Sequence, residues 1–309
     1  MSSYQVQPIP GPILDLGEGP HWDAERQSLY YVNLFQAEVL RLDYPTNQVF
    51  RARVDGSTHA TFIIPVKNKH DQFIIGDGNR IVLIQWDGVS EVARSIEVIA
   101  TFGELEQTNR WNDGKADCHG RLFGGTMISE MQGNPFESNT GNFYRFEANQ
   151  LKFTRLISNV FISNGLAWNY NTKKFYYADS GAFEIKEFDF DAEGNLSNGK
   201  VWFDFKQNGQ RPVEFPDGMT IDDQGNLYVA VFHAAKVLKI NPSGQVEMEI
   251  QTPASQVTSV AFGGPQLDEL YVTTASRQDS GIPLPEPAGA TFRVTGLGVR
   301  GTPMYQVEL

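Results

Sequence analysis

One pattern recurs along the whole chain: two strand-like segments separated by a short polar turn. It occurs six times, with starts 41 to 52 residues apart, as HWDAERQSLYYVN from His21, VKNKHDQFIIGD from Val66, KADCHGRLFGGTM from Lys115, AWNYNTKKFYYADS from Ala167, MTIDDQGNLYVAVF from Met219 and VAFGGPQLDELYVTT from Val260. A period of this length indicates a repeat architecture in which each unit packs against its neighbours.

Each unit continues into a third segment in which alternate residues are apolar, such as AEVLRLD, GNFYRFE and AKVLKI. This alternation is typical of a half-buried strand, and the Asp, Asn and Gly residues between segments are those that hairpin turns need. Helical periodicity is nearly absent. The sequence therefore predicts an all-β, six-bladed β-propeller with a central polar channel. The alternatives are a β-helix, whose repeats are far shorter, and a pair of sandwiches, which would not explain one period along the full length.

No Gly/Ser or Pro-rich linker divides the repeats, so we expect residues 1–309 to form a single domain. A closed ring needs its last blade tied to its first. Residues 4–8 and residues 304–309 both resemble short strands that are available for this closure.

Charge and composition exclude several classes of function. Lys and Arg number 25 and Asp and Glu 37, so the net charge of −12 disfavours binding to nucleic acid or to an anionic membrane surface. The single cysteine cannot form an intramolecular disulfide, and the first residues lack the pattern of a secretory leader. We therefore expect a cytoplasmic monomer that acts on a small-molecule substrate, without nucleic acid or membrane partners.

The residues just before the first strand of each unit are equivalent by the repeat, so they should form a ring at one mouth of the channel. They are Glu18-Gly19, His59-Ala60, Asp113-Gly114, Asn164-Gly165, Asp217-Gly218 and Thr258-Ser259. Converging oxygen-bearing side chains, three of them carboxylates, require a cation to offset their repulsion. We expect one divalent metal ion, with Ca²⁺, Mg²⁺ or Mn²⁺ favoured by oxygen ligands and Zn²⁺ as a further option.

The alternative is that Asp-Gly and Asn-Gly are ordinary turn dipeptides. Their shared phase in the repeat argues against this, because unrelated turns need not occupy equivalent positions. Other chemistry is less well supported. Cys118-His119 is expected in a hairpin turn, no histidine spacing typical of zinc sites is present, and no serine lies in a nucleophile-elbow context.

Several segments carry a resemblance to a known family. They are LGEGPHWD (16–23), RWNDGKAD (110–117), FGGTM (123–127), ISNGLAWN (162–169), YYADSG (176–181) and PDGMTIDDQGNLYVAV (216–231). Together they resemble the signature segments of the regucalcin, gluconolactonase and luciferin-regenerating enzyme family, and the segments 257–274 and 292–301 are most similar to its insect members. The resemblance implies a six-bladed propeller with one catalytic divalent metal in the channel.

The resemblance also implies site residues. The metal ligands fall on Glu18, Asn164 and Asp217, and the substrate contacts fall on Arg110, Asn112 and Glu130, with Asp113 as a nearby polar support. Trp111 departs from the smaller Phe or Leu expected at its position. It either reshapes the pocket, where a flat ligand could stack on it, or packs beneath the site.

The expected function is a metal-dependent, lactonase-like hydrolase of small cyclic esters. In that reaction Asp217 is the expected general base on water, and Arg110 and Asn112 would orient the substrate. The first alternative is a luciferin-regenerating enzyme that converts oxyluciferin toward luciferin precursors. The second is a non-catalytic calcium-binding regulator, and a third is a scaffold for protein partners, which predicts apolar patches instead of carboxylates at the channel.

Overall fold

The computed structural model describes residues 4–309, apart from 104–105, 148–150 and 279–283. The described residues form antiparallel strands joined by turns, with short 3₁₀ turns at Leu34–Gln36 (η1) and Ser180–Ala182 (η4) among them. None of the helical segments in these residues has the length and apolar character needed to cross a membrane. The all-β prediction is confirmed.

Four of the sheets have four strands each. The strands of the first are, in spatial order, β10 (Asn109–Ala116), β11 (Leu122–Ile128), β12 (Gly141–Glu147) and β13 (Lys152–Val160); those of the second are β14 (Ser163–Asn169), β15 (Lys174–Asp179), β16 (Glu184–Phe190) and β17 (Leu196–Asp204). The third contains β18 (Phe215–Ile221), β19 (Leu227–Phe232), β20 (Lys236–Ile240) and β21 (Val246–Gln251). The fourth contains β1 (Gln5–Pro8), β24 (Phe292–Thr295), β23 (Glu269–Thr274) and β22 (Val257–Gly263).

The first two repeats form one eight-stranded sheet. Its order is β2 (Gly17–Asp23), β3 (Ser28–Asn33), β4 (Glu38–Asp43), β5 (Gln48–Val54), β9 (Val92–Thr101), β8 (Arg80–Gln85), β7 (Gln72–Asp77) and β6 (Ile63–Pro65). Each half is an antiparallel set of four strands. Among the described residues, the strand ladder between the halves is the parallel pairing of β5 with β9, at Arg53↔Val92 and Val54↔Ala93.

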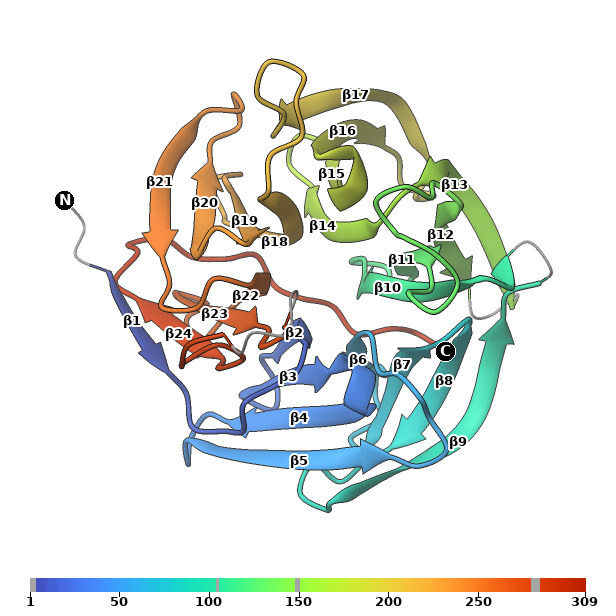
Figure 1. The fold of residues 1–309 in the computed structure, drawn as a ribbon. Helices are drawn as coiled ribbons and strands as arrows, with labels where there is room; N and C mark the ends of the chain where they lie inside the picture. Colours follow the sequence, from blue (N-terminus) through green and yellow to red (C-terminus); the bar gives the residue numbers. More distant parts are fainter. Residues whose placement is uncertain (1–3, 104–105, 148–150, 279–283) are drawn as a thin grey trace.

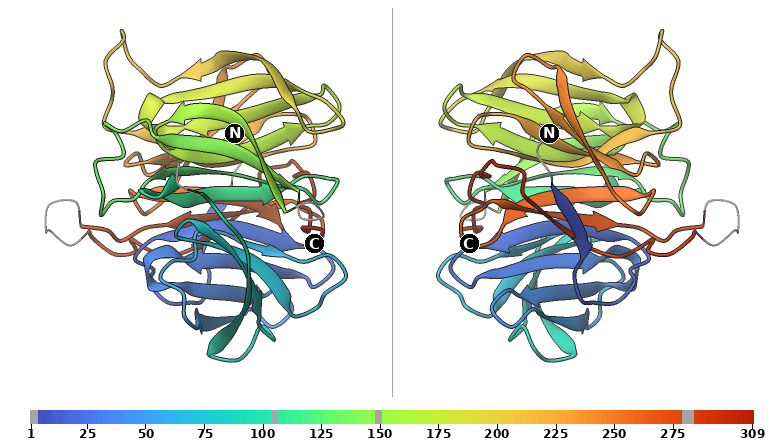
Figure 2. Two further views of the ribbon diagram at one scale, coloured as in Figure 1. Left: turned by 90° about the vertical axis from the view of Figure 1, so that its right-hand side faces the viewer. Right: turned by 90° about the vertical axis from the view of Figure 1, so that its left-hand side faces the viewer.

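The sheets are arranged around a central axis, and the first strand of each repeat lies nearest to it (Figure 1). Seen from the side, the strands of neighbouring repeats stack around the ring (Figure 2). This is a propeller. Its hydrophobic core lies between adjacent sheets, as where Val237 and Ile250 of one sheet pack with Phe262 and Val272 of the next.

Buried aspartates form the turns between the first two strands of several repeats. Asp23 accepts hydrogen bonds from the backbone N–H groups of Glu25 and Arg26, and Asp222 accepts them from those of Gln224 and Asn226. Because such side chains satisfy the backbone of a tight turn, these positions fix each hairpin.

The N-terminal strand closes the ring, as predicted. β1 pairs antiparallel with β24 in the sheet that also holds β22 and β23, from Gln5↔Thr295 to Pro8↔Phe292. The outer edge of the last sheet is therefore built from the start of the chain.

The C-terminal segment takes a different path from the one predicted. Instead of adding a closing strand, it forms isolated bridges to three different sheets, at Asp222↔Gly301, Ala116↔Tyr305 and Val66↔Val307. The prediction for residues 304–309 is therefore wrong in its detail. Their backbone groups bond to the ends of inner strands, so the segment runs across the axis of the ring.

Candidate functional site

The inner strands are irregular at the positions that the repeat aligns. Pairing between the first and second strands shifts between Glu18 and His21 in β2, between Trp111 and Gly114 in β10, between Ser163 and Leu166 in β14, and between Pro216 and Met219 in β18. Such bulges bend a strand and re-aim its side chains, and they are frequent beside functional sites. A bulge thus occurs at the repeated dipeptide in each of these four inner strands, and it changes the direction of the side chains there.

The Asp-Gly and Asn-Gly pairs at 113–114, 164–165 and 217–218 lie within β10, β14 and β18, so the alternative that they are ordinary turns is wrong. Of the six repeated dipeptides, His59-Ala60 lies before its strand, β6. The glycines serve close packing instead. A Cβ atom on Gly165 would lie 2.7 Å from the backbone oxygen of Asp217, and one on Gly218 would lie 2.0 Å from the hydroxyl of Ser259. Glycine is therefore needed where the inner strand of one sheet meets the next.

Three buried carboxylates lie near one another at this end of the channel. Burial raises the pKa of Glu18 well above its usual range, and the carboxylates of Asp217 and Asp113 raise it further. Burial likewise raises the pKa of Asp217 well above its usual range, with Asp113 adding to the effect. These three acids are about 100 or more positions apart in sequence, yet they lie near enough to affect one another. This agrees with the convergence of the acids that the repeat predicts.

Three oxygen atoms at the site are buried and have no hydrogen-bond partner among the residues that the structure describes. They are Oδ1 of Asn164, Oδ1 of Asp217 and Oδ2 of Asp113. The amide nitrogen of Asn164 donates to the hydroxyl of Ser180 at 3.0 Å, which leaves the amide oxygen as the free acceptor. Unpartnered buried acceptors are costly, so a cation is the species that this arrangement would accommodate.

The donor chemistry fits a hard divalent cation. Glu18, Asn164 and Asp217 offer oxygen atoms only, which suits Ca²⁺, Mg²⁺ or Mn²⁺. Throughout the described residues, no group of three or more His, Cys, Asp or Glu side chains is placed to hold a metal ion. Among these residues carboxylates alone therefore do not form a metal cluster, and a cation at this place would draw on the amide oxygen of Asn164 as well as on carboxylates.

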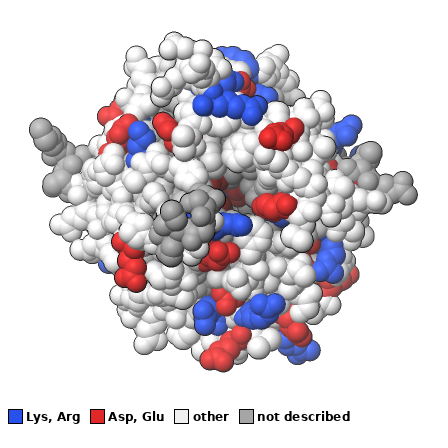
Figure 3. Space-filling view, viewed as in Figure 1, with Lys and Arg blue, Asp and Glu red and all other residues white. Residues whose placement is uncertain are grey.

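Arg110, Asn112 and Glu130 form one connected group beside the acids. The Arg110 guanidinium is bidentate on Glu130, with Nε to Oε2 at 2.8 Å and Nη2 to Oε1 at 2.5 Å. Its Nη1 donates to Oδ1 of Asn112 at 2.8 Å, and Asn112 donates to the backbone oxygen of Ser163, also at 2.8 Å. The three predicted substrate contacts therefore lie together. Acidic and basic side chains gather around the hollow near the centre of the face in Figure 3.

Trp111 packs beneath the site. It is fully buried and contacts the rings of Phe62, Phe102 and Phe153. The alternative that Trp111 reshapes the pocket is wrong, and its ring cannot stack on a ligand.

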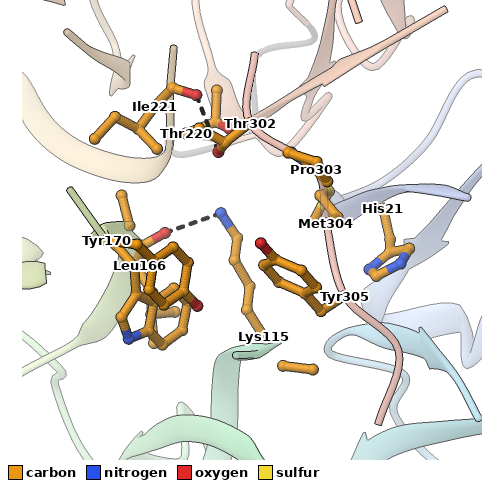
Figure 4. Close-up of a pocket in the computed structure, with 13 residues that line it drawn as sticks. His21, Lys115, Leu166, Tyr170, Thr220, Ile221, Thr302, Pro303, Met304 and Tyr305 are labelled. Atoms are coloured by element: carbon orange, nitrogen blue, oxygen red, sulfur yellow. Dashed lines mark hydrogen bonds between the residues drawn. The ribbon is translucent and has the colours of Figure 1, made fainter. Parts of the chain in front are cut away.

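Two groups of functional interest were missed in the sequence. The first is Lys115 in the channel, whose ammonium group donates to the backbone oxygens of Leu166 at 3.0 Å and Met219 at 2.5 Å. It lines a cavity with His21 and with Tyr305 of the C-terminal segment (Figure 4). The alternation Asp113, Lys115 within one strand was a usable signal, because both side chains should face the same way.

The second group is a set of aromatic rings near the site residues. Phe215 opens β18, stacks on Phe232 at 5.0 Å between ring centroids, and lies 5.0 Å from Phe136. Arg211 lies over the rings of Phe161 and Phe183 at 5.6 and 5.5 Å. Most of these residues belong to loops outside the repeat, so periodicity gave no signal for them.

Comparison with known proteins identifies the family of this chain. The family model described as SMP-30/Gluconolactonase/LRE-like region matches residues 16–276. The chain belongs to this family. A regucalcin from Danio rerio is 34% identical, with 99% of both chains covered, and a regucalcin from Homo sapiens is 32% identical, also with 99% of both covered.

Solved structures give the same result. A luciferin-regenerating enzyme is 38% identical, with a TM-score of 0.90 over 99% of this chain and 100% of that one. A gluconolactonase from Xanthomonas campestris, at 18% identity, has a TM-score of 0.71 over 94% of this chain and 89% of that one, and it supports the fold alone. The family resemblance read from the sequence is confirmed.

Proposed function

We propose that this chain is a metal-dependent hydrolase of small cyclic esters, of the sugar-lactonase type. In this proposal the two halves of the eight-stranded sheet act as separate blades, so that the propeller has six. The observation that carries it is the set of buried, unpartnered oxygen atoms on Asn164 and Asp217, beside the carboxylate of Glu18. These three residues are the proposed ligands of one divalent cation.

The bound cation would polarise the ester carbonyl and stabilise the negative charge that develops on its oxygen. The chain's own residues supply the rest. Asp217, once a cation offsets the neighbouring carboxylates, is ionised at neutral pH and accepts a proton from water as the general base. The water oxygen then forms a bond to the carbonyl carbon. As the ring C–O bond breaks, Asp217 returns its proton to the departing ring oxygen, which gives a hydroxy acid and restores the carboxylate of Asp217.

Arg110 and Asn112 are proposed to orient the substrate. Their mutual hydrogen bond and the bidentate Arg110–Glu130 pair fix the donors and acceptors of this group before a ligand arrives. Preorganised polar groups of this kind suit a polyhydroxylated ring, because each hydroxyl both donates and accepts.

A calcium-binding regulator would use the same ligands. The function of Arg110 does not separate the two possibilities, since the guanidinium already has protein partners in Glu130 and Asn112. Turnover separates them, because a regulator binds the cation without consuming a lactone.

A second candidate, a luciferin-regenerating type of reaction on an aromatic thiazolinone, is favoured by the rings near the site. Phe215 lies two residues before Asp217, and Phe183 directly follows the η4 turn that contains Ser180. Met131 and Val213, on neighbouring loops, are 90% and 76% exposed. Aromatic and exposed apolar side chains beside a polar site suit a flat, partly apolar ligand.

The test is hydrolysis of gluconolactone, dihydrocoumarin and an oxyluciferin-like thiazolinone with Mn²⁺, Ca²⁺, Mg²⁺ or Zn²⁺, before and after chelation. Asp217→Asn should lower turnover about 100-fold or more, in line with the loss of a general base. Titration of Mn²⁺ into Asp217→Ala by calorimetry should show strongly weakened binding.

Asp268→Asn is the matched control, because Asp268 is exposed in the turn between β22 and β23, and it should behave like the parent protein. The proposal is wrong if the parent turns over no lactone with any of these metals. It is also wrong if turnover survives both chelation and the Asp217 substitution. Turnover of the thiazolinone alone would select the second candidate.

A further inference from the structure

Lys115 links three inner strands that share no backbone ladder. It lies on β10, and its Nζ donates to the backbone oxygens of Leu166 on β14 at 3.0 Å and Met219 on β18 at 2.5 Å. These three strands belong to three different sheets. Figure 4 shows the side chain extending across the space between them, with its ammonium group directed at Leu166.

The two carbonyl groups occupy equivalent places. In β14 regular pairing is lost after Ser163 and resumes at Leu166, and in β18 it is lost after Pro216 and resumes at Met219. The residues inside these two bulges include Asn164 and Asp217. Lys115 therefore binds the backbone oxygen of the residue at the end of each bulge, Leu166 in β14 and Met219 in β18. Each of these bulges changes the direction of a site side chain.

Charge and packing are consistent with a fixed position for this side chain. Burial lowers the pKa of Lys115, and the carboxylate of Asp113, two residues earlier on β10, opposes this by attracting the ammonium group. β14 and β18 are in close contact at this level, since Gly165 faces the backbone of Asp217 and Met219. An ammonium group has three N–H donors, and two of them are committed to these carbonyl groups.

We propose that Lys115 is a positioning residue for the cation site: by holding the ends of both bulges, it sets the side chains of Asn164 and Asp217 in place before the cation binds. This inference rests on the proposed function, because it concerns the same cation. A ligand pair that must be ordered on binding gives a weaker site than one already in place.

An opposite expectation follows if only the charge of Lys115 matters. A nearby positive charge repels a divalent cation, so its removal would then strengthen cation binding. Lys115→Met removes both the charge and the hydrogen bonds. Weaker binding in this variant supports the positioning role, and equal or tighter binding contradicts it.

The experiment is calorimetric titration of Mn²⁺ into the metal-free protein and its variants. Lys115→Met is expected to bind Mn²⁺ about ten-fold more weakly than the parent. Lys115→Gln removes the charge but keeps an NH₂ donor group, so its affinity should lie between the two. Lys236→Met is the matched control, because Lys236 pairs with Glu249 on outer strands, and its affinity should stay within about two-fold of the parent's.

Circular dichroism establishes that each variant is folded before titration. If Lys115→Met does not fold, Lys115→Gln decides the question, with at least a three-fold loss expected and unchanged or tighter binding contradicting the proposal. The electron paramagnetic resonance spectrum of bound Mn²⁺ should also change in the Lys115 variants, which a purely global loss of stability would not produce. Absence of Mn²⁺ binding in the parent would overturn the proposed metal site and this inference together.

Discussion

Several titratable residues in the channel have pKa values that differ from those of the same groups in water. Glu18 and Asp217 are buried acids near other acids, and burial raises the pKa of each well above its usual range. His21, further along the same channel, is the basic counterpart, since burial lowers its pKa to about 4 against the opposing influence of Asp23. The channel therefore disfavours charge of either sign unless a partner is present.

His21 gives a prediction for the dependence of stability on pH. Because its pKa is lower in the folded state than in the unfolded chain, folding releases a proton between pH 6.5 and about 4. Above pH 6.5 His21 is neutral in both states. As the pH falls toward 4, the unfolded chain gains a proton at His21 and the folded state does not, so the free energy of unfolding decreases by up to about 3 kcal/mol.

His21→Gln should therefore lose less stability than the parent over that interval. The measurement is urea unfolding of both proteins at pH 7, 6, 5 and 4. Parallel curves for the two proteins would show that His21 is not the titrating group.

Among residues, the sequence predicted the acids and the Arg110 group but not Lys115 or the aromatic rings. Repetition placed Glu18, Asp113, Asn164 and Asp217 in one ring, because equivalent positions in a closed ring must lie together. The family resemblance selected the three expected ligands from this ring and assigned the Arg110 group. Phe136 and Arg211 lie in loops without a counterpart in the other repeats, so their meeting depends on tertiary packing that periodicity does not encode.

At the level of elements, the inner strands combine bulges with glycine contacts. Each bulge re-aims a site side chain, and each adjacent glycine lets the neighbouring strand approach. Strand periodicity predicted the strands themselves. It could not predict the bulges, because a single extra residue changes register without changing composition.

Gly218→Ala tests this packing. A new Cβ would lie 2.0 Å from the hydroxyl of Ser259 and 2.8 Å from the Cα of Ser259, so β18 and β22 must separate. We expect a loss of about 1 to 3 kcal/mol in the free energy of unfolding, typical of overpacking, together with weaker Mn²⁺ binding through Asp217.

Thermal unfolding and Mn²⁺ calorimetry measure the two effects. Gly103→Ala is the control, because a Cβ there would have no atom of the other described residues within 4 Å, and it should be neutral. Adding Ser259→Gly should restore part of the stability. If Gly218→Ala matches the parent in both measurements, close approach at this position has no role.

The whole molecule is a ring joined at several places by chain segments distant in sequence. The repeat predicted the sheets and the closure by β1, since a ring of sheets must end on its own first strand. It did not predict the parallel contact of β5 and β9 that merges the first two repeats. The parallel ladder at this contact has two residue pairs, and it has no counterpart in the hairpins of the repeat.

Removal of residues 1–10 tests closure of the ring. Without β1, the backbone of β24 loses its partner at Gln5 to Pro8 and becomes an unprotected edge. We expect a lower melting temperature and a greater tendency to aggregate, measured by calorimetry and by light scattering. A truncated protein as stable and as monodisperse as the parent would show that closure depends on other contacts.

The path of the C-terminal segment has a consequence for how the protein is made. Gly301, Tyr305 and Val307 bridge to Asp222, Ala116 and Val66, which are translated about 80 to 240 residues earlier. β1 is translated before all the other described strands, and it finds its partner only when β24 has been synthesised. During most of translation, β1 and the strands that line the channel therefore lack these partners. The ring is completed late, when β1 pairs with β24 and the C-terminal segment forms its bridges.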